Sequence, residues 1–140
     1  VHGFSKEKRE AKIAELTALL GLDTVANKKA GKLSGGWQRR LSIAMALISE
    51  PEILFLDEPT LGLDVLARSD LWELIRQLKT RMTILLTTHY MEEAEALADK
   101  VAIMKDGRLL TCDSVEAIKE RADTNNFEEA FVRIVKGEAK

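Results

Sequence analysis

The chain has 140 residues, of which 46% are hydrophobic and 31% charged, and its formal net charge is −2. This length suits one domain or a compact part of a larger one, and the composition is that of an ordinary globular protein. The small net charge provides no general attraction to nucleic acid or to an acidic membrane. The single cysteine, Cys112, excludes an internal disulfide and is typical of a reducing compartment.

No segment approaches the ~20 apolar residues that a membrane-spanning helix needs. The first residues, VHGFS, lack a basic stretch followed by an apolar one, so we expect no signal peptide. The first residue is not methionine, which is consistent with a chain that begins within a longer gene. Together these features predict a cytosolic protein or a part of one.

The first third of the chain predicts two helices. Residues 6–20 have the period of an amphipathic helix whose apolar residues form one stripe: Ile13, Leu16 and Leu20. A second helix is predicted to begin at the Ser-Gly-Gly of residues 34–36 and to run through Ile48. Its apolar residues surround most of the helix, so we expect burial on nearly all sides: Leu41, Ile43, Ala44, Met45, Leu47 and Ile48.

The middle of the chain predicts two strands joined by a helix. Residues 53–56 form a continuous apolar run followed by two acids, which is typical of a strand covered on both faces in a parallel sheet. Residues 83–87 predict a second buried strand. The helix between the strands is indicated by apolar residues at helical spacing: Leu71, Leu74, Ile75 and Leu78.

The last third predicts a short helix over residues 91–98, then a hairpin and two more helices. Residues 101–104 and 108–111 flank an Asp-Gly pair, which is a strong signal for a tight turn. Asp113 or Ser114 is placed to cap a helix that runs to Arg121. The final helix has one apolar face: Phe127, Phe131, Ile134 and Val135. This order of elements predicts an α/β fold with right-handed crossovers.

The most informative stretch is ILFLDEPTLGLD, residues 53–64. A buried strand that ends in Asp57 and Glu58 places two carboxylates at the carboxyl edge of a sheet, where open α/β folds bind ligands. Asp57 suits holding Mg²⁺ through water, and Glu58 suits polarising an attacking water. An isolated Asp-Glu pair is more often just the end of a strand, so the neighbouring motifs decide between the two interpretations.

Two further elements favour nucleotide chemistry. Ser34, Gly35 and Gly36 at a helix start expose successive backbone N–H groups, and the positive end of the helix dipole favours an anionic phosphate. The alternative there is a plain serine cap with flexible glycines. His89 follows the second strand and can donate to a phosphate oxygen or hold the attacking water, although a lone histidine in this place is more often a surface residue.

Together these residues have the order and approximate spacing of the motifs of the ATP-binding cassette (ABC) family of ATPases. LSGG with Arg40 resembles the family's signature motif, and ILFLDE resembles its Walker B strand, with the catalytic glutamate at Glu58. Gly62-Leu63-Asp64 resembles the D-loop, and Thr88-His89 resembles the switch histidine. The resemblance extends over residues 33–107.

The tail sequence FEEAF, residues 127–131, also resembles the end of ATP-binding subunits that serve multidrug, sodium or polysaccharide exporters.

Two departures from the family pattern matter. Trp37 stands where the signature usually has Gln, so we expect an altered interface contact rather than an inactive site. No G-x-x-x-x-G-K-[ST] motif occurs, and the 32 residues before Leu33 leave no room for the family's phosphate loop and Q-loop.

The resemblance implies a partial P-loop NTPase fold: α/β, with a mostly parallel sheet, flanking helices, and a C-terminal hairpin plus helices. It divides the chain into part of a helical signature subdomain (1–50), the C-terminal part of the ATPase core (51–112) and C-terminal helices (113–140). ATP and Mg²⁺ are the implied cofactors. The implied site residues are Glu58 and His89 for catalysis, Asp57 for the metal, and Ser34, Gly35, Gly36 and Asp64 for the nucleotide.

The resemblance also implies two partners, a second ATP-binding subunit in a head-to-tail dimer and a transmembrane permease, and a location on the cytoplasmic face of the membrane. Without the strand that leads into the phosphate loop, we expect an unpaired sheet edge and a bare apolar face, and therefore self-association, a rearranged sheet or dependence on a complementary fragment. We also expect the chain to bind ATP poorly and not to hydrolyse it. The alternative function is a non-catalytic module that docks in trans on a complete ABC ATPase. DNA-repair or chromosome ATPases would predict long heptad coiled coils, which the sequence lacks.

Overall fold

The computed structural model describes residues 5–138. The first four residues, on which the prediction about a signal peptide depends, lie outside the described residues. The chain divides into two compact units, residues 1–87 and residues 88–140, and each is described by itself. Among the described residues, no helix has the length and apolar character needed to cross a membrane.

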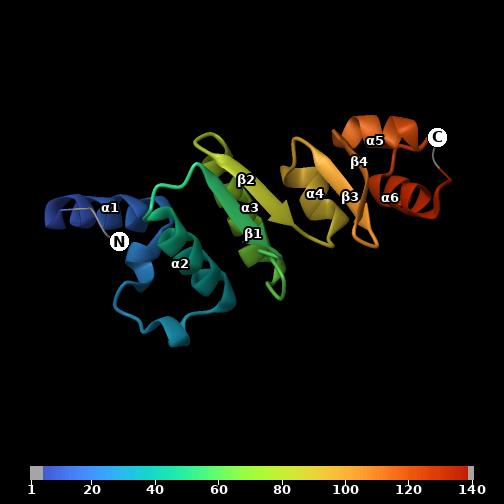
Figure 1. Ribbon diagram of the computed structural model, residues 1–140. Helices are drawn as coiled ribbons and strands as arrows, with labels where there is room; N and C mark the ends of the chain where they lie inside the picture. Colours follow the sequence, from blue (N-terminus) through green and yellow to red (C-terminus); the bar gives the residue numbers. More distant parts are fainter. Residues whose placement is uncertain (1–4, 139–140) are drawn as a thin grey trace. The chain divides into compact units, whose positions relative to one another are not determined.

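The first unit combines helices with a two-stranded parallel sheet (Figure 1). Its elements, in chain order, are α1 (Lys6–Leu19), the 3₁₀ turns η1 (Leu22–Val25) and η2 (Ala30–Lys32), α2 (Gly35–Leu47), β1 (Ile53–Asp57), α3 (Val65–Lys79) and β2 (Thr83–Thr87). The two strands pair in parallel over their whole length. The predicted strand–helix–strand unit is therefore confirmed.

α3 forms because its apolar residues recur at helical spacing and because Asp64 caps its first turn. The Asp64 carboxylate accepts a hydrogen bond from the Ala67 N–H at 2.9 Å. The four apolar residues that predicted this helix are all buried: Leu71, Leu74, Ile75 and Leu78. α3 lies along one face of the strands (Figure 1), and its apolar stripe forms much of the core of the first unit.

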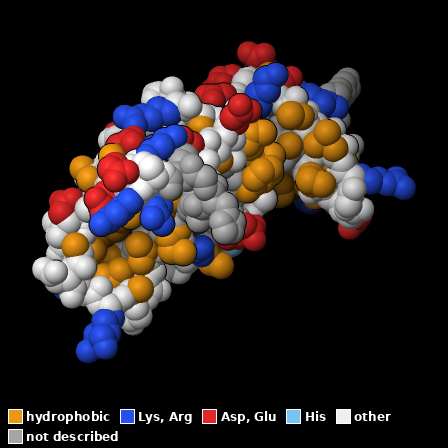
Figure 2. All heavy atoms as spheres, turned by 60° about the vertical axis from the view of Figure 1, so that its left-hand side comes forward, with side chains coloured by type: hydrophobic (Ala, Val, Ile, Leu, Met, Phe, Trp, Pro, Cys, Tyr) orange, Lys and Arg blue, Asp and Glu red, His pale blue; other side chains and the backbone are white. Residues whose placement is uncertain are grey.

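The prediction that β1 is covered on both faces is wrong, and β2 is less buried than predicted, whereas the expected bare apolar face is present. In β1 the buried Leu54 and Leu56 alternate with exposed residues, and the Phe55 side chain is 69% exposed. Its register partner in β2, Leu85, is 51% exposed. Hydrophobic side chains also reach the surface among charged ones on the face drawn in Figure 2. The sheet therefore presents one covered face and one exposed apolar face, and we call the latter, formed by Ile53, Phe55 and Leu85, the open face.

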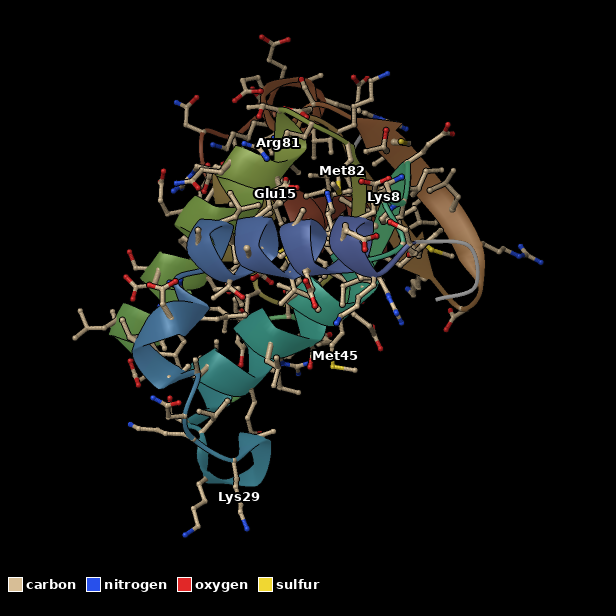
Figure 3. The ribbon with its side chains drawn as sticks, turned by 90° about the vertical axis from the view of Figure 1, so that its left-hand side faces the viewer. Lys8, Glu15, Lys29, Met45, Arg81 and Met82 are labelled. Atoms are coloured by element: carbon tan, nitrogen blue, oxygen red, sulfur yellow. The ribbon has the colours of Figure 1, made fainter. Side chains whose placement is uncertain are left out.

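The helices α1 and α2 each bury one face only. α2 buries Ile43, Ala44 and Leu47, whereas Met45 is 66% exposed (Figure 3), so the prediction of burial on nearly all sides is wrong. In α1 and its C-cap, Leu16 and Leu20 are buried but Ile13 is exposed. Helical period identifies an apolar stripe correctly, yet how much of it is covered depends on which elements pack against it.

The second unit contains an antiparallel hairpin and three helices: α4 (Met91–Leu97), β3 (Val101–Lys105), β4 (Arg108–Asp113), α5 (Val115–Arg121) and α6 (Phe127–Lys136). Asp106 and Gly107 have φ angles of 50° and 73°, which is the left-handed geometry that an Asp-Gly turn predicts. Ser114, one of the two predicted caps, accepts a hydrogen bond from the N–H of Ala117 at 3.1 Å. The hairpin and helices close around one core: Ile103, Val115, Ile118, Ala122, Phe127, Ala130 and Ile134.

The α/β fold class is confirmed, with one parallel pair and one antiparallel hairpin. The division of the chain into 1–50, 51–112 and 113–140 stays a prediction.

Candidate functional site

The candidate site lies where β1 and β2 end together. Asp57 and Thr87 are the last residues of the two strands and are partners in the register. The Thr87 hydroxyl donates a hydrogen bond to the Asp57 carboxylate. The backbone N–H of Glu58 donates to the Thr87 carbonyl at 3.0 Å, which continues the ladder by one residue. The two carboxylates thus lie at the carboxyl edge of a parallel pair, where the sequence predicted them.

Glu58 begins a tight loop with an uncommon backbone conformation. Its φ is 45°, in the left-handed region, which costs a non-glycine residue roughly 1–2 kcal/mol. The Leu61 N–H closes a turn onto the Glu58 carbonyl at 3.2 Å, and the Leu63 N–H bonds the Thr60 carbonyl at 3.1 Å. Gly62, with a φ of 75°, supplies the second left-handed position at low cost. Glu50, Asp106 and Asp123 have similar φ angles, so what distinguishes Glu58 is that its left-handed position lies at the end of the parallel strands.

α2 begins with the Ser-Gly-Gly segment, and both glycines are closely packed against neighbouring side chains. An added Cβ at Gly36 would lie 3.1 Å from the Ala67 Cβ, and one at Gly35 would lie 3.3 Å from the Leu63 Cδ2. Ser34 occupies the N-cap position, but its side chain makes no capping hydrogen bond. Ser34 therefore does not cap the helix through its side chain, and both interpretations of the segment stay open. The start of α2 packs against α3 and the loop before it.

Trp37, which replaces the family's Gln, contacts a neighbouring arginine. The Arg40 guanidinium lies over the Trp37 ring, 5.3 Å from its centroid. Arg40 also donates to the Leu20 carbonyl at 3.1 Å and lies 3.7 Å from the Asp70 carboxylate. Arg40 therefore connects α2 to the end of α1 and to α3. The sequence analysis noted Arg40 only as part of the segment that resembles the signature motif. Nothing in the spacing of residues indicated these contacts.

Arg39 contributes to the site and was missed by the sequence analysis. Its guanidinium donates to the Glu58 carbonyl at 3.3 Å. It also lines a groove of about 230 Å³ beside β1, together with Asp57 and Pro59. Two adjacent arginines on a half-exposed helix are ordinary in sequence, so nothing in the pattern distinguished Arg39.

His89 belongs to the second unit, just before α4. Its imidazole is exposed and contacts the Tyr90 ring, with centroids 4.2 Å apart and planes tilted by 38°. The Thr88 hydroxyl accepts a hydrogen bond from the Tyr90 N–H at 3.0 Å, which fixes this local turn. The other predicted site residues belong to the first unit. That His89 and Glu58 serve one phosphate stays a prediction.

The donor groups fit part of a site for Mg²⁺ and ATP. Within residues 5–138, no three Asp, Glu, His or Cys side chains gather into a metal site. Mg²⁺ usually keeps several waters and takes one or two carboxylates plus phosphate oxygens, so a single carboxylate such as Asp57 fits it. The Ser34 hydroxyl, which makes no cap bond, and the first N–H groups of α2 fit a phosphate.

Comparisons with known proteins agree with the motifs. The profile of the family described as "ABC transporter" matches residues 2–61, a range that includes the signature segment and Glu58. The chain is 44% identical over 119 residues to Nod factor export ATP-binding protein I of Burkholderia orbicola, covering 84% of this chain and 39% of that protein. It is 40% identical over 119 residues to Phospholipid-transporting ATPase ABCA3 of Homo sapiens, covering 85% of this chain and 7% of that protein.

The fold is shared with a solved structure described as "Structure of ATP binding subunit of ABC transporter". The TM-score is 0.76 at 27% identity, and the match covers 95% of this chain and 57% of that chain. The chain thus spans less than half the length of the curated relatives named above. Profile, sequence identity and fold agree with the four motifs, and the chain is homologous to the ATP-binding domains of ABC transporters.

Proposed function

We propose that this chain is the C-terminal part of an ABC transporter ATP-binding subunit, which couples ATP binding and hydrolysis to membrane transport. The observation that carries the proposal is the placement of Asp57 and Glu58 at the end of a parallel strand pair, beside the Thr87 hydroxyl. ATP and Mg²⁺ are the cofactors that the family uses. When bound, they supply the scissile phosphate bond and the charge that neutralises the phosphate oxygens.

Each site residue has a proposed role. Glu58 polarises the attacking water, and its position at a strand end, with the backbone fixed on both sides, supports this role. Asp57 holds the metal through water, with its carboxylate oriented by Thr87. His89 donates to a phosphate oxygen, consistent with its exposed ring.

The start of α2 is proposed to contact a phosphate held by a second ATP-binding subunit in a head-to-tail dimer. The contacts come from Ser34, Gly35 and Gly36. Two features support this role: the Ser34 hydroxyl makes no capping hydrogen bond, and the positive end of the helix dipole lies there. Asp64 lies at the same interface, and its bond to the Ala67 N–H fixes the loop there. A transmembrane permease is the other proposed partner, with the chain on the cytoplasmic face of the membrane.

The chain by itself is proposed to bind ATP weakly and not to hydrolyse it. A helix terminus contributes ~0.3–1 kcal/mol to anion binding, or ~2 kcal/mol when sheltered, whereas even millimolar affinity needs about 4 kcal/mol. The 140 residues contain no G-x-x-x-x-G-K-[ST] loop, so another segment must supply the phosphate cradle. In the described part of the chain, β1 and β2 each pair on one side only, which supports self-association or pairing with such a segment.

The alternative is a non-catalytic module that docks on a complete ABC ATPase, and the missing phosphate loop favours it. The two functions separate in an ATPase assay in which the chain is mixed either with a segment carrying a phosphate loop or with a complete ATP-binding domain. If the chain is catalytic, the first mixture hydrolyses ATP, and Glu58→Gln lowers turnover roughly 10²- to 10⁴-fold. The matched control, Glu73→Gln on the exposed side of α3, leaves turnover unchanged.

A docking module gives the opposite pattern. It alters turnover only in the second mixture, and Glu58→Gln then has no effect. Calorimetry of the chain alone completes the test, because ATP binding at low micromolar affinity would contradict the proposed need for another segment.

A further inference from the structure

Glu58 holds a backbone conformation that its own sequence does not favour. With a φ of 45° and a β-carbon, it carries strain of roughly 1–2 kcal/mol, which glycine would avoid. Such a residue persists only where surrounding contacts fix it. The contacts that fix the Glu58 backbone therefore determine the direction of its Cα–Cβ bond, from which the carboxylate extends.

Three hydrogen bonds hold the Glu58 backbone. Its N–H donates to the Thr87 carbonyl at 3.0 Å, and its carbonyl accepts from the Leu61 N–H at 3.2 Å. The same carbonyl accepts from the Arg39 guanidinium at 3.3 Å, across 19 residues of sequence. The first two bonds belong to the sheet and to the loop itself. Of these three bonds, the one from Arg39 ties Glu58 to a different helix, and its charged donor makes it stronger than a neutral bond of the same geometry.

Arg39, the donor of this hydrogen bond, lies in a closely packed part of α2. Arg39 is half-buried in the second turn of α2, and it lines the groove beside β1 with Asp57 and Pro59. α2 also packs closely on α3, because a Cβ added at Gly36 would lie 3.1 Å from the Ala67 Cβ. Arg39 therefore connects the start of α2 with the Glu58 carbonyl.

We infer that Arg39 is a positioning residue: by holding the Glu58 carbonyl, it fixes the direction of the Glu58 carboxylate and links the signature helix to it. The inference rests on the proposed function, in which Glu58 polarises the attacking water. A lysine in place of Arg39 would hold the Glu58 carbonyl in part, through its single ammonium group. A methionine has no donor and would not hold it.

The first test compares Arg39→Met, Arg39→Lys and the control Arg76→Met in the 140-residue chain by NMR. In Arg39→Met we expect the carbonyl ¹³C resonance of Glu58 to shift and the amides of Glu58 and Leu61 to exchange roughly tenfold faster. The buried amides of α3 keep their wild-type rates. Arg39→Lys retains part of the protection, and Arg76→Met, a change on an exposed side chain, retains all of it.

Three results would overturn the inference. One is an unchanged Glu58 carbonyl and unchanged exchange in Arg39→Met. Another is equal acceleration at every amide, including those of α3, since that indicates a loss of global stability. The third is a random-coil resonance for Glu58 in the wild-type chain.

The second test is ATPase turnover of the chain combined with a segment that carries a phosphate loop. Arg39→Met is expected to lower kcat roughly 10- to 100-fold with KM for ATP nearly unchanged, because a misplaced group weakens the chemical step. Arg39→Lys is expected to restore part of kcat. If Glu58→Gln abolishes turnover and Arg39→Met does not, the inference alone fails. If Glu58→Gln leaves turnover intact, the proposed function fails, and the NMR result still decides whether Arg39 fixes the Glu58 backbone.

Discussion

The two units cover a small sheet in different ways. In the second unit, the antiparallel hairpin β3–β4 contributes Ile103 to a closed core with α5 and α6, in which Phe127 is 2% exposed. In the first unit, the parallel pair β1–β2 leaves Phe55 69% exposed on the open face. Antiparallel sheets commonly leave one face in water, whereas parallel strands are normally covered on both. The hairpin also leaves Met104 and Leu109 64% and 59% exposed, so both sheets have an exposed apolar face. An exposed face is common for an antiparallel hairpin but not for a parallel pair, so the first unit resembles part of a larger sheet.

The first unit is held together by contacts between distant elements. The Lys12 ammonium of α1 lies 3.0 Å from the Glu15 carboxylate and 3.3 Å from Glu50, in the turn that leads to β1. Glu15 in turn lies 3.8 Å from the Arg81 guanidinium, in the turn that leads to β2 (Figure 3). These ion pairs tie α1 to the segments that precede both strands. They lie at the end of the sheet opposite to Asp57 and Glu58.

The largest expected difference between the units comes from one substitution made in each. Phe127→Ala removes a buried ring and is expected to cost about 3–5 kcal/mol of unfolding free energy. Phe55→Ala, on the open face, is expected to change stability by less than about 0.5 kcal/mol and to reduce self-association. Denaturant unfolding measures the first effect and light scattering the second. Equal destabilisation by the two changes would mean that the open face is covered in solution.

A smaller effect is expected where α2 meets α3 in the first unit. Gly36→Val places a side chain against Ala67, 3.1 Å from the position of the new Cβ, and is expected to cost roughly 1–3 kcal/mol. Gly31→Val is the matched control, because no atom lies within 4 Å of the added Cβ there. Adding Ala67→Gly to Gly36→Val should restore part of the loss. Equal unfolding midpoints for the two valine variants would show that α2 and α3 are not in close contact.

The smallest effect concerns the ion pairs of α1. The hydrogen bond to Glu15, with a further contribution from Glu50, raises the pKa of Lys12 above its ordinary value. A lysine pKa that is raised on folding stabilises the folded state at every pH below the pKa of the unfolded chain, which is about 10.4. This stabilisation is lost as the pH rises through the pKa of the folded state. Lys12→Met is therefore expected to cost about 0.2–1 kcal/mol at pH 8 and to match the wild type at a second pH that lies above the raised pKa of Lys12.

Denaturant midpoints at the two pH values measure this dependence, with Lys6→Met, a change in an exposed pair at 3.9 Å, as the control. If Lys12→Met still lowers the free energy of unfolding at the higher pH, the cause is lost packing rather than lost charge.

Much of the fold was predictable because the determining signals are local. The spacing of Leu71, Leu74 and Leu78 identified α3, and the Asp-Gly turn identified the hairpin. The meeting of Asp57 with the end of the second strand was also predictable, since two neighbouring parallel strands end at the same edge of a sheet. The positions of the candidate site residues along the chain follow from such patterns alone.

Contacts across the first unit were not predictable in this way. The bond from Arg39 to the Glu58 carbonyl and the contacts of Arg40 with Leu20 and Asp70 join residues that are far apart in sequence. Their geometry depends on how the helices pack, and the side chains involved are ordinary for an exposed helix surface. The same is true of Met45, whose helical position indicated burial although no neighbouring element covers it.

The sequence by itself determined the helices, the strands, their caps and turns, and the order of the motifs, because each depends on the period of apolar residues and on the backbone preferences of a few neighbours. Tertiary structure alone decided which apolar faces are covered, how closely Gly36 packs against α3, and what holds Glu58 in its strained conformation. Those features depend on contacts between atoms of segments that are far apart in sequence. The spacing of residues along the chain does not show which segments come into contact.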